Sequence, residues 1–245
     1  MNIPQTSLPR VVIVGGGFAG LALAKGLEKK DIQVVLLDKH NYHTFQPLLY
    51  QVSTGGLEPD SIAFPIRKLF NNLENYHFRL AEVNHIHADK NEIATSIGNL
   101  EYDYLVLATG SKTNFFGNKS IEEHAMEMKT IPQSLNIRSL TLENFELALL
   151  TSDIEERTAL MNFVIVGGGP TGVETAGAFS ELKNNVLPKD YPELDLNRMQ
   201  VTLIEGSPRL LNGMSDKSHT DAMKALENLG VTVLLNTRVT SFTNN

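Results

Sequence analysis

Two glycine-rich segments share one pattern, and glycines at this spacing let a backbone come close to a phosphate. The segments are GGGFAG at residues 15–20 and GGGPTG at residues 167–172. Each follows an apolar run of strand type, 11–14 or 163–166, and precedes a helix-like stretch, which is the context in which G-x-G-x-x-G binds a dinucleotide. One such turn is a weak signal. Two of them, each followed by a second strand ending in an acid, predict that the chain holds two dinucleotides.

Within each segment the glycines of the pattern have separate tasks. The first permits the tight turn, the next lets the backbone approach a pyrophosphate with no side chain in the way, and the last lets the helix pack closely on its strand. These glycines are Gly15, Gly17 and Gly20 in the first segment, and Gly167, Gly169 and Gly172 in the second. The following helix adds unpaired N–H groups and the positive end of its dipole. We therefore expect one pyrophosphate to lie on each segment.

Each segment is followed by a second strand-like run that ends in an acid. Asp38 ends the run 32–37. Its spacing from the glycine segment is close to the roughly 20 residues expected for an acceptor of a ribose 2′-OH. Glu205 ends the run 200–204 at a longer spacing, because the polar stretch 184–197 intervenes. A carboxylate there repels a 2′-phosphate, so the second site favours NADH over NADPH. The alternative for either segment is a glycine-rich loop that binds nothing. This alternative is stronger for the second segment, because its acid follows at a longer spacing than expected.

The composition is that of an ordinary, mildly acidic α/β protein. The chain has 245 residues, of which 42% are hydrophobic, and a formal charge of −7. This length gives room for one large domain or two smaller ones. The charge and the lack of a basic run give no indication of a nucleic-acid partner. The N-terminal residues resemble neither a signal peptide nor a transit peptide, and no apolar run is long enough to span a bilayer.

The chain contains no cysteine. A flavoprotein disulfide reductase needs a redox-active cysteine pair beside its flavin, and a sulfide oxidoreductase needs cysteines as well. Neither chemistry can run on these residues. The lack of cysteine also removes any disulfide argument about the compartment, and a reducing cytoplasm is compatible with the sequence.

The order of apolar runs predicts an α/β fold with two Rossmann-like dinucleotide-binding units. In the first unit we expect strands at 10–15 and 32–38, a helix at 18–29, a long loop at 39–59 and a short helix ending near residue 70. Short strands at 77–80, 81–87, 92–95 and 100–101 then form an antiparallel ribbon, which crosses over to a buried strand at 104–107. That strand runs into Ala108-Thr109-Gly110, a turn where the backbone can pass close to a ligand.

A helix at 134–150 leads to the second unit, which starts at residue 161. We expect a strand, a helix, an insertion, a strand, a helix at 216–229, and strands at 231–235 and 238–242. A doubly wound dinucleotide domain continues beyond such a strand, so this second unit looks incomplete.

Several local strings resemble one family of flavoproteins. The two glycine segments, the turn at 108–110 and the order of parts are similar to the two-dinucleotide flavoproteins. More closely, the strings DKHNYHTFQPLLYQV at 38–52, LENFELA at 142–148 and GPTGVE at 169–174 resemble type II NADH dehydrogenases, the non-proton-pumping NADH:quinone oxidoreductases. The resemblance covers nearly the whole chain. It implies an FAD-binding domain at 1–115, a helical connection at 116–160 and an incomplete NADH-binding domain at 161–245.

The resemblance also assigns roles to single residues. Around FAD it implies contacts with the pyrophosphate, ribose, isoalloxazine and nucleotide by Gly15, Gly17, Phe18, Ala19, Gly20, Asp38, Lys39, Thr44, Val83, Ala108, Thr109 and Gly110. Around NADH it implies Gly167, Gly169, Thr171, Gly172 and Glu205. Glu174 is similar to the family's glutamate near the meeting point of nicotinamide, flavin and quinone, which would make it the catalytic carboxylate.

Only the last of the expected reaction steps calls for a protein acid. Hydride transfer from NADH to FAD needs none, whereas quinone reduction consumes protons that a carboxylate near the flavin could supply. Taken without the resemblance, Glu174 is a glutamate at a helix start, favoured there by the helix dipole alone.

His85 and His87 alternate on a strand and point to one face, like a metal pair. No third ligand is apparent, so we expect solvent-facing histidines and no metal site.

The resemblance implies NADH and a quinone as substrates, a role in the respiratory chain and peripheral membrane association. The expected location is the cytoplasm or the cytoplasmic face of the inner membrane, and a homodimer is compatible with it. A Gly-Asp motif and a C-terminal amphipathic segment, both typical of that family, do not occur in these residues. Two other functions stay open. One is an NADH-dependent reductase of a protein such as ferredoxin, against which the string at 38–52 argues. The other is a nucleotide-binding remnant that turns nothing over, which the two missing features favour.

Overall fold

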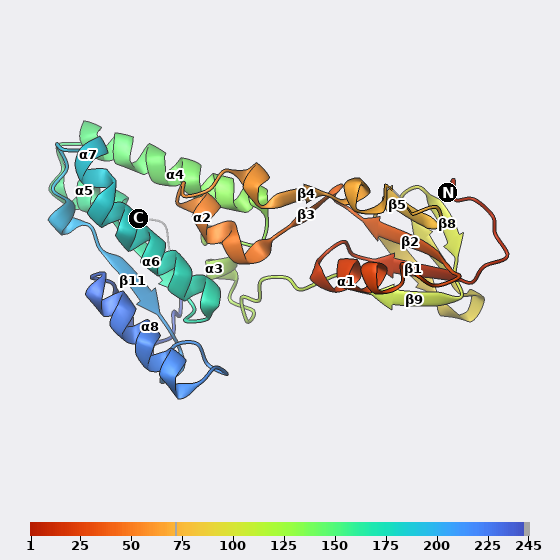
Figure 1. Ribbon diagram of the computed structural model, residues 1–245. Helices are drawn as coiled ribbons and strands as arrows, with labels where there is room; N and C mark the ends of the chain where they lie inside the picture. Colours follow the sequence, from red (N-terminus) through yellow and green to blue (C-terminus); the bar gives the residue numbers. More distant parts are fainter. Residues whose placement is uncertain (72, 243–245) are drawn as a thin grey trace. The chain divides into compact units, whose positions relative to one another are not determined.

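The computed structural model describes residues 1–71 and 73–242, and these form two compact units (Figure 1). The first unit comprises Met1–Phe45 and Ile62–Lys112. The second comprises Gln46–Ser61 and the chain from Thr113 onward. Each unit contains one of the two glycine segments, so each is described by itself below.

The first unit is built on a four-stranded parallel sheet with the order β5-β2-β1-β9. Its strands are β1 (Arg10–Val14), β2 (Gln33–Asp38), β5 (Tyr76–Leu80) and β9 (Tyr104–Leu107). Helix α1 (Phe18–Gly26) connects β1 to β2, as expected for a parallel pair, which requires a crossover. The α/β class with parallel sheets of Rossmann type is confirmed.

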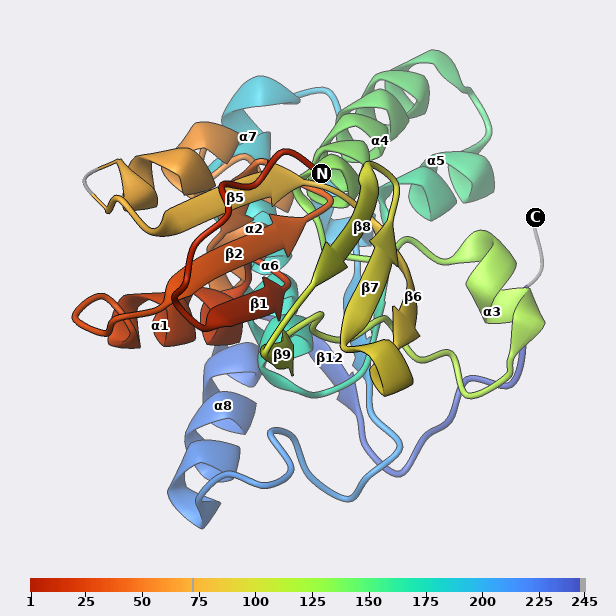
Figure 2. The same cartoon turned by 90° about the vertical axis from the view of Figure 1, so that its right-hand side faces the viewer.

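Both faces of this sheet are covered, and the alternation of side chains along β1 divides them. Val11 and Ile13 face a core shared with α1, whereas Val12 and Val14 face a core shared with an antiparallel ribbon. The ribbon consists of β6 (Val83–His87), β7 (Glu92–Thr95) and β8 (Gly98–Glu101), seen in yellow in Figure 2. Because both faces are buried, β1 and β2 read as continuous apolar runs, as parallel strands do.

The predicted long loop at 39–59 is wrong, because this stretch contains short elements. Strand β3 (Tyr42–Thr44) pairs with β4 (Ala63–Pro65) in the first unit. Between them lie the 3₁₀ turns η1 (Gln46–Leu48) and η2 (Pro59–Ser61) and helix α2 (Leu49–Ser53), all in the second unit. Elements of three to five residues are too short to carry a periodicity, and tertiary contacts rather than local propensity stabilise them. The short helix expected near residue 70 is the 3₁₀ helix η3 (Ile66–Phe70).

The second unit contains a three-stranded parallel sheet with the order β10-β11-β12. Its elements are β10 (Phe163–Val166), β11 (Val201–Ile204), β12 (Thr232–Leu234), α3 (Lys119–His124), α4 (Ile131–Leu150), α5 (Ile154–Met161), α6 (Pro170–Asn185), α7 (Leu187–Asp190), η5 (Leu196–Arg198) and α8 (Asp216–Asn228). Helix α4 begins earlier than predicted, because Thr130 and Gln133 form a capping box at its N-terminus. Helices α4, α6 and α8 contribute Phe145, Phe179 and Leu226 to one apolar core.

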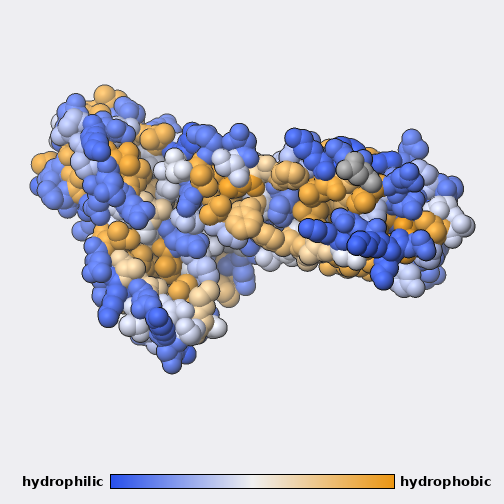
Figure 3. Space-filling view, in the orientation of Figure 1, coloured by the Kyte–Doolittle hydropathy of each residue, from blue (hydrophilic) through white to orange (hydrophobic). Residues whose placement is uncertain are grey.

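The two sheets differ in how their second face is covered. Val164 and Val166 of β10 are 63% and 55% exposed, whereas their counterparts Val12 and Val14 in β1 are 0% and 9% exposed. On the face drawn in Figure 3, hydrophobic surface appears as orange patches between hydrophilic blue areas. In the described part of the chain, no helix has the length and hydrophobicity that crossing a membrane requires.

The strand predicted at 238–242 is also wrong. Its backbone is hydrogen-bonded to side chains of the α3 region instead of to a neighbouring strand. Asn118 Nδ2 donates to the carbonyl of Thr240 at 2.9 Å, and the N–H of Phe242 donates to Ser120 Oγ at 2.9 Å. These side chains satisfy backbone groups that a sheet ladder would otherwise pair, so β-propensity did not decide the outcome.

Candidate dinucleotide-binding site

The first glycine segment forms the tight turn between β1 and α1. Gly15 has a φ of +112°, a backbone conformation that favours glycine. A Cβ added to Gly15 would lie 2.2 Å from the carbonyl oxygen of Ala108, so the predicted turn at residues 108–110 passes directly beside it. A Cβ on Gly20 would lie 1.9 Å from the carbonyl oxygen of Gly15, because α1 starts against the turn itself. A Cβ on Gly17 would meet no atom within 4 Å, which leaves that side of the turn open for a pyrophosphate.

The second segment repeats this geometry. Gly167 has a φ of +113°, and a Cβ on Gly172 would lie 1.8 Å from the carbonyl oxygen of Gly167. A Cβ on Gly169 would meet nothing within 4 Å. Helix α6 begins at Pro170, and proline is well suited to a first helical position because no N–H partner is lost. Both segments therefore provide a cradle open on one side, at a helix N-terminus that favours anions.

The two predicted acids contact the same atom of their respective turns. Asp38 Oδ2 accepts a hydrogen bond from the N–H of Gly16 at 2.5 Å, and Glu205 Oε2 accepts one from the N–H of Gly168 at 2.5 Å. Gly16 and Gly168 are the middle glycines of the two Gly-Gly-Gly triplets. The longer spacing before Glu205 therefore does not displace its carboxylate from the turn. In dinucleotide-binding folds of this type, an acid at the end of the second strand accepts a hydrogen bond from a ribose hydroxyl.

Glu205 is held as a carboxylate. Burial by itself would raise its pKa, but hydrogen bonds from the side chain of Ser207 and from the backbone N–H groups of Gly168, Ser207 and Gly206 together lower the pKa below its usual value. Ser207 donates from its N–H at 2.6 Å and from its hydroxyl, both to Oε1. A carboxylate in this environment repels a 2′-phosphate and accepts hydrogen bonds from ribose hydroxyls.

The remaining predicted FAD contacts are distributed over the first unit. Phe18 and Ala19 open α1, Lys39 follows the acid at the end of β2, Thr44 ends β3 and Val83 begins β6. Of the predicted NADH contacts, Thr171 lies in the first turn of α6 beside the glycine segment. In the first unit, Gly15 and Ala108 directly follow the parallel strands β1 and β9 and Asp38 ends β2, and in the second unit Gly167 and Glu205 directly follow β10 and β11. Ligands of open α/β sheets bind at this carboxyl edge of the strands.

Sequence reasoning named Phe18 as an FAD contact but did not predict the aromatic rings that pack against it at the first turn. His43 Nδ1 lies 3.0 Å from the carbonyl oxygen of Gly16, and its ring stands edge-on to Phe18 with centroids 5.0 Å apart. Phe18 also meets Phe45 at 5.5 Å. Phe18 and Phe45 are 47% and 44% exposed, so this end of the turn presents an apolar surface to solvent. The only available signal was the position of His43 and Phe45 within the family-like string at 38–52.

Glu174 lies on α6 and lines a cavity of about 520 Å³ in the second unit. The facing wall comes from α2 and the turn after it, including Tyr50, Gln51 and Thr54. Partial burial raises the pKa of the Glu174 carboxyl above its usual value. Desolvation disfavours the charged form of the carboxyl, which is the opposite of the effect of a helix N-terminus. A carboxyl with a raised pKa stays protonated at pH values closer to neutral than an ordinary glutamate, so it can donate a proton to a group bound in the cavity.

The histidine pair lies on the ribbon of the first unit. The rings of His85 and His87 stand with their centroids 4.5 Å apart on β6. Within the described residues no group of three or more histidine, cysteine or acidic side chains is arranged to hold a metal ion.

Comparison with known proteins gives a consistent set of relatives. Residues 9–245 match the family described as pyridine nucleotide-disulphide oxidoreductase. The type II NADH:quinone oxidoreductases Ndh and NdhA of Mycobacterium tuberculosis are 38% and 37% identical to this chain over 240 and 236 residues. These alignments cover 96% and 95% of this chain but 52% and 50% of the relatives, so the chain spans about half their length.

A solved structure agrees with this set. The structure of NDH2 from Plasmodium falciparum in complex with NADH matches with a TM-score of 0.89 and 28% identity. The match covers 96% of this chain and 49% of that chain. The resemblance to type II NADH dehydrogenases inferred from local strings is confirmed.

Proposed function

The chain belongs to the pyridine nucleotide-disulphide oxidoreductase family, and from this membership we propose that it binds FAD and NADH and transfers electrons from NADH to a quinone. The observation that carries the proposal is the duplicated turn, in which each acid contacts the middle glycine beside an open cradle. The printed names of the relatives, type II NADH:quinone oxidoreductases, supply the acceptor.

We assign FAD to the first turn and NADH to the second. The domain bounds expected from the resemblance, 1–115 and 161–245, differ from the two compact units, because residues 46–61 and 113–160 belong to the second unit. The first turn offers the N–H groups at the start of α1, the Asp38 carboxylate and the neighbouring turn at 108–110. Bound FAD would supply the hydride acceptor and the two-electron donor, chemistry that needs no acid from the protein. The task of these residues is to hold the cofactor in place and to keep its pyrophosphate charge satisfied.

At the second turn, Glu205 selects between the two nicotinamide cofactors. Its lowered pKa keeps it charged at neutral pH, so a ribose 2′-OH finds an acceptor and a 2′-phosphate finds a repelling charge. We propose NADH as the substrate for this reason. Gly167, Gly169, Gly172 and Thr171 form the cradle for its pyrophosphate.

Glu174 is the residue to which we assign proton delivery. Reduction of a quinone to a quinol takes up two electrons and two protons, and a partly buried carboxyl with a raised pKa is suited to hold one of them. Quinones dissolve in lipid, so we also propose peripheral contact with the cytoplasmic face of a membrane, and a homodimer is compatible with it.

The test is the visible spectrum of the purified chain, recorded before and after anaerobic addition of NADH. Flavin bands that bleach with NADH and recover with a soluble quinone support the proposal. Bleaching with recovery only by a ferredoxin would support a reductase of a protein acceptor. A chain that takes up neither FAD nor NADH would contradict the proposal and support a nucleotide-binding remnant.

A further inference from the structure

The carbonyl group of the middle glycine is hydrogen-bonded in both turns. In the first turn, the carbonyl oxygen of Gly16 lies 3.0 Å from His43 Nδ1. In the second, the carbonyl oxygen of Gly168 accepts a bond from the N–H of Leu211 at 2.7 Å. The N–H groups of these glycines bond to the acids, so both the N–H and the carbonyl of each middle glycine are hydrogen-bonded.

The hydrogen bond to the carbonyl of the middle glycine fixes the direction of the N–H group of the following residue. A trans peptide is planar, so the carbonyl of one residue and the N–H of the following residue point in opposite directions. Holding the carbonyl of Gly16 therefore orients the N–H of Gly17, and holding that of Gly168 orients the N–H of Gly169. Gly17 and Gly169 precede the first residues of α1 and α6 and border the open side of each cradle. Their N–H groups are the ones that a pyrophosphate would meet first.

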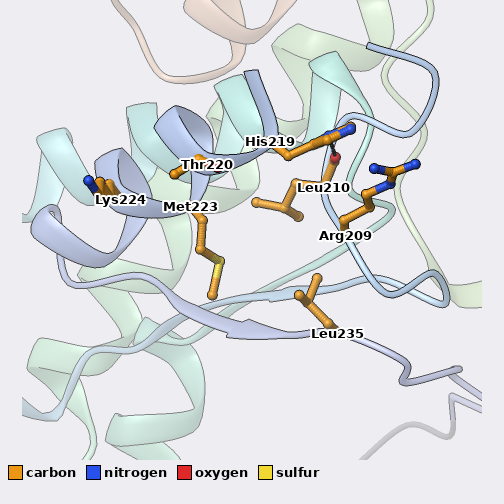
Figure 4. A pocket seen from close by; sticks show the side chains of 7 residues that line it. All are labelled: Arg209, Leu210, His219, Thr220, Met223, Lys224 and Leu235. Carbon is orange, nitrogen blue, oxygen red and sulfur yellow. Dashed lines mark hydrogen bonds between the residues drawn. The ribbon is translucent and has the colours of Figure 1, made fainter. Parts of the chain in front are cut away.

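In the second turn, the hydrogen-bonded chain extends one peptide further and also ends at a histidine. His219 Nδ1 lies 2.5 Å from the carbonyl oxygen of Leu210, as the dashed line in Figure 4 marks. The carbonyl of Leu210 and the N–H of Leu211 belong to one peptide group. Thus His219 holds the peptide that in turn holds Gly168. Successive hydrogen bonds through peptide groups polarise and strengthen one another.

Both histidines are well placed to act as fixed donors. A carbonyl oxygen can only accept, so Nδ1 carries the hydrogen in each bond, and both the neutral tautomer and the imidazolium can provide it. His219 is 8% exposed on α8, beside the cavity lined by Leu210, Met223 and Leu235 that Figure 4 shows. The ring of His43 is braced by the edge-on contact with Phe18. Neither ring can leave its carbonyl without losing packing contacts.

We propose that His43 and His219 are positioning residues that orient the pyrophosphate-binding N–H groups of the first and second turn, respectively. His43 acts directly on Gly16, and His219 acts on Gly168 through the peptide between Leu210 and Leu211. The assignment of FAD to the first turn and NADH to the second rests on the proposed function. The orientation of the turns themselves does not.

The first measurement compares nucleotide binding by four variants of the whole chain with the wild type. His43→Ala is expected to raise the dissociation constant for FAD about tenfold and to leave that for NADH within about twofold, since one hydrogen bond between neutral groups is worth up to about a factor of ten. His219→Ala is expected to do the reverse. His43→Asn and His219→Asn keep an N–H donor close to the position of Nδ1, so each is expected to restore most of the affinity.

Matched controls remove side chains nearby without touching the two carbonyls. His40→Ala removes an imidazole from the loop that carries His43, where its ring contacts Tyr42. Lys224→Ala removes a cation that lines the cavity beside His219. Both are expected to leave the two dissociation constants within about twofold. A crossed pattern with asparagine rescue is not produced by general loss of structure, so its absence would overturn the proposal.

The second measurement needs no ligand, which separates this proposal from the proposed function. Amide hydrogen exchange is followed at Gly16, whose N–H bonds to Asp38, and at Leu211, whose N–H bonds to Gly168. His43→Ala is expected to accelerate exchange about tenfold at Gly16 alone, and His219→Ala at Leu211 alone. If the wild type binds neither nucleotide, the proposed function fails and this experiment alone decides. Unchanged exchange at both amides would overturn the positioning role.

Discussion

Replacing Glu205 with glutamine tests the cofactor assignment of the second turn at a single atom. Glutamine keeps one side-chain oxygen, which can still accept from Ser207, but it removes the negative charge. It also places an amide NH₂ where Oε2 accepts the N–H of Gly168 at 2.5 Å. The substitution therefore removes a repelling charge and one charge-assisted hydrogen bond, while the volume of the side chain hardly changes.

The two losses have different sizes for the two cofactors. For NADPH, a carboxylate and a unit charge 4 Å apart repel by about 1 kcal/mol in water and about 4 kcal/mol near a protein surface. A 2′-phosphate carries roughly 1.5 to 2 charges, so the repulsion relieved amounts to at least about 1.5 kcal/mol, or about tenfold in affinity. For NADH, the lost acceptor costs about 1.5 to 3 kcal/mol, which weakens binding. Glu205→Gln should therefore lower the ratio of the NADPH and NADH dissociation constants by at least about tenfold.

The assay is a fluorescence titration with each nucleotide at low ionic strength, repeated at high salt, where the wild-type ratio should shrink because salt screens the repulsion. Asp38→Asn, the same change in the first turn, is the matched control and should leave the ratio unchanged. A ratio for Glu205→Gln within about twofold of wild type would refute the placement of the ribose at Glu205. The lowered pKa also sets the direction in which the stability of the fold changes with pH. Glu205 stabilises the fold above its unfolded-state pKa, and this contribution disappears as the pH falls through the folded value.

Three further outcomes are expected. Gly172→Ala would place a Cβ 1.8 Å from a carbonyl oxygen and should lower the free energy of unfolding in urea by about 3 kcal/mol or more. Gly177→Ala is the control, because its Cβ would lie 3.7 Å from the nearest atom, and it should be neutral or stabilising by up to about 1 kcal/mol. Equal effects of the two substitutions would contradict the close-packing argument. Val12→Ala should cost about 1 to 3 kcal/mol and Val164→Ala less than about 0.5 kcal/mol, because the first side chain is fully buried and the second is 63% exposed; a large effect at Val164 would mean that its face is covered in solution. Glu174→Gln should slow quinone reduction about a hundredfold and remove the decline of this rate as the pH rises through the raised pKa of Glu174. The rate of flavin bleaching by NADH should stay within about twofold of wild type. Slowed bleaching would count against proton delivery as the role of Glu174.

The sequence predicted most of the fold wherever a run of residues carried its own signal. The strands and helices around the two turns follow from apolar runs and glycines, and three of the four strands predicted for the ribbon form it. The fourth, predicted at 77–80, is wrong as a ribbon strand, because β5 pairs in parallel with β2 at the edge of the main sheet. The stretch 39–59 was misread because β3, α2 and the 3₁₀ turns are stabilised by contacts with distant elements. The stretch 238–242 has strand-like residues, yet its backbone bonds to Asn118 and Ser120. No local pattern could predict partners so far away in the chain.

The site could be predicted only in part. Glycine and acid positions follow from chemistry that admits few residue types, so they are visible in the sequence. The role of His43 is different, because a carbonyl accepts from many donors and no spacing marks the one it uses. His219 left a weak trace: it lies two turns before Leu226 on α8, and both are buried on the same face. That periodicity predicts a core position, but not a hydrogen bond to Leu210.

Strand register explains why the acid of the second copy reaches its turn despite the longer spacing. In the first unit Val14 pairs with Leu37, and in the second Val166 pairs with Ile204, so in both the acid follows the last paired residue directly. The residue after the second strand therefore lies beside the turn after the first strand, whatever the length of chain between them. The extra residues fold outside the sheet as α7 and η5. Sequence distance from glycine to acid is thus a weak criterion for this motif, whereas both copies place the acid directly after the last residue paired with the first strand.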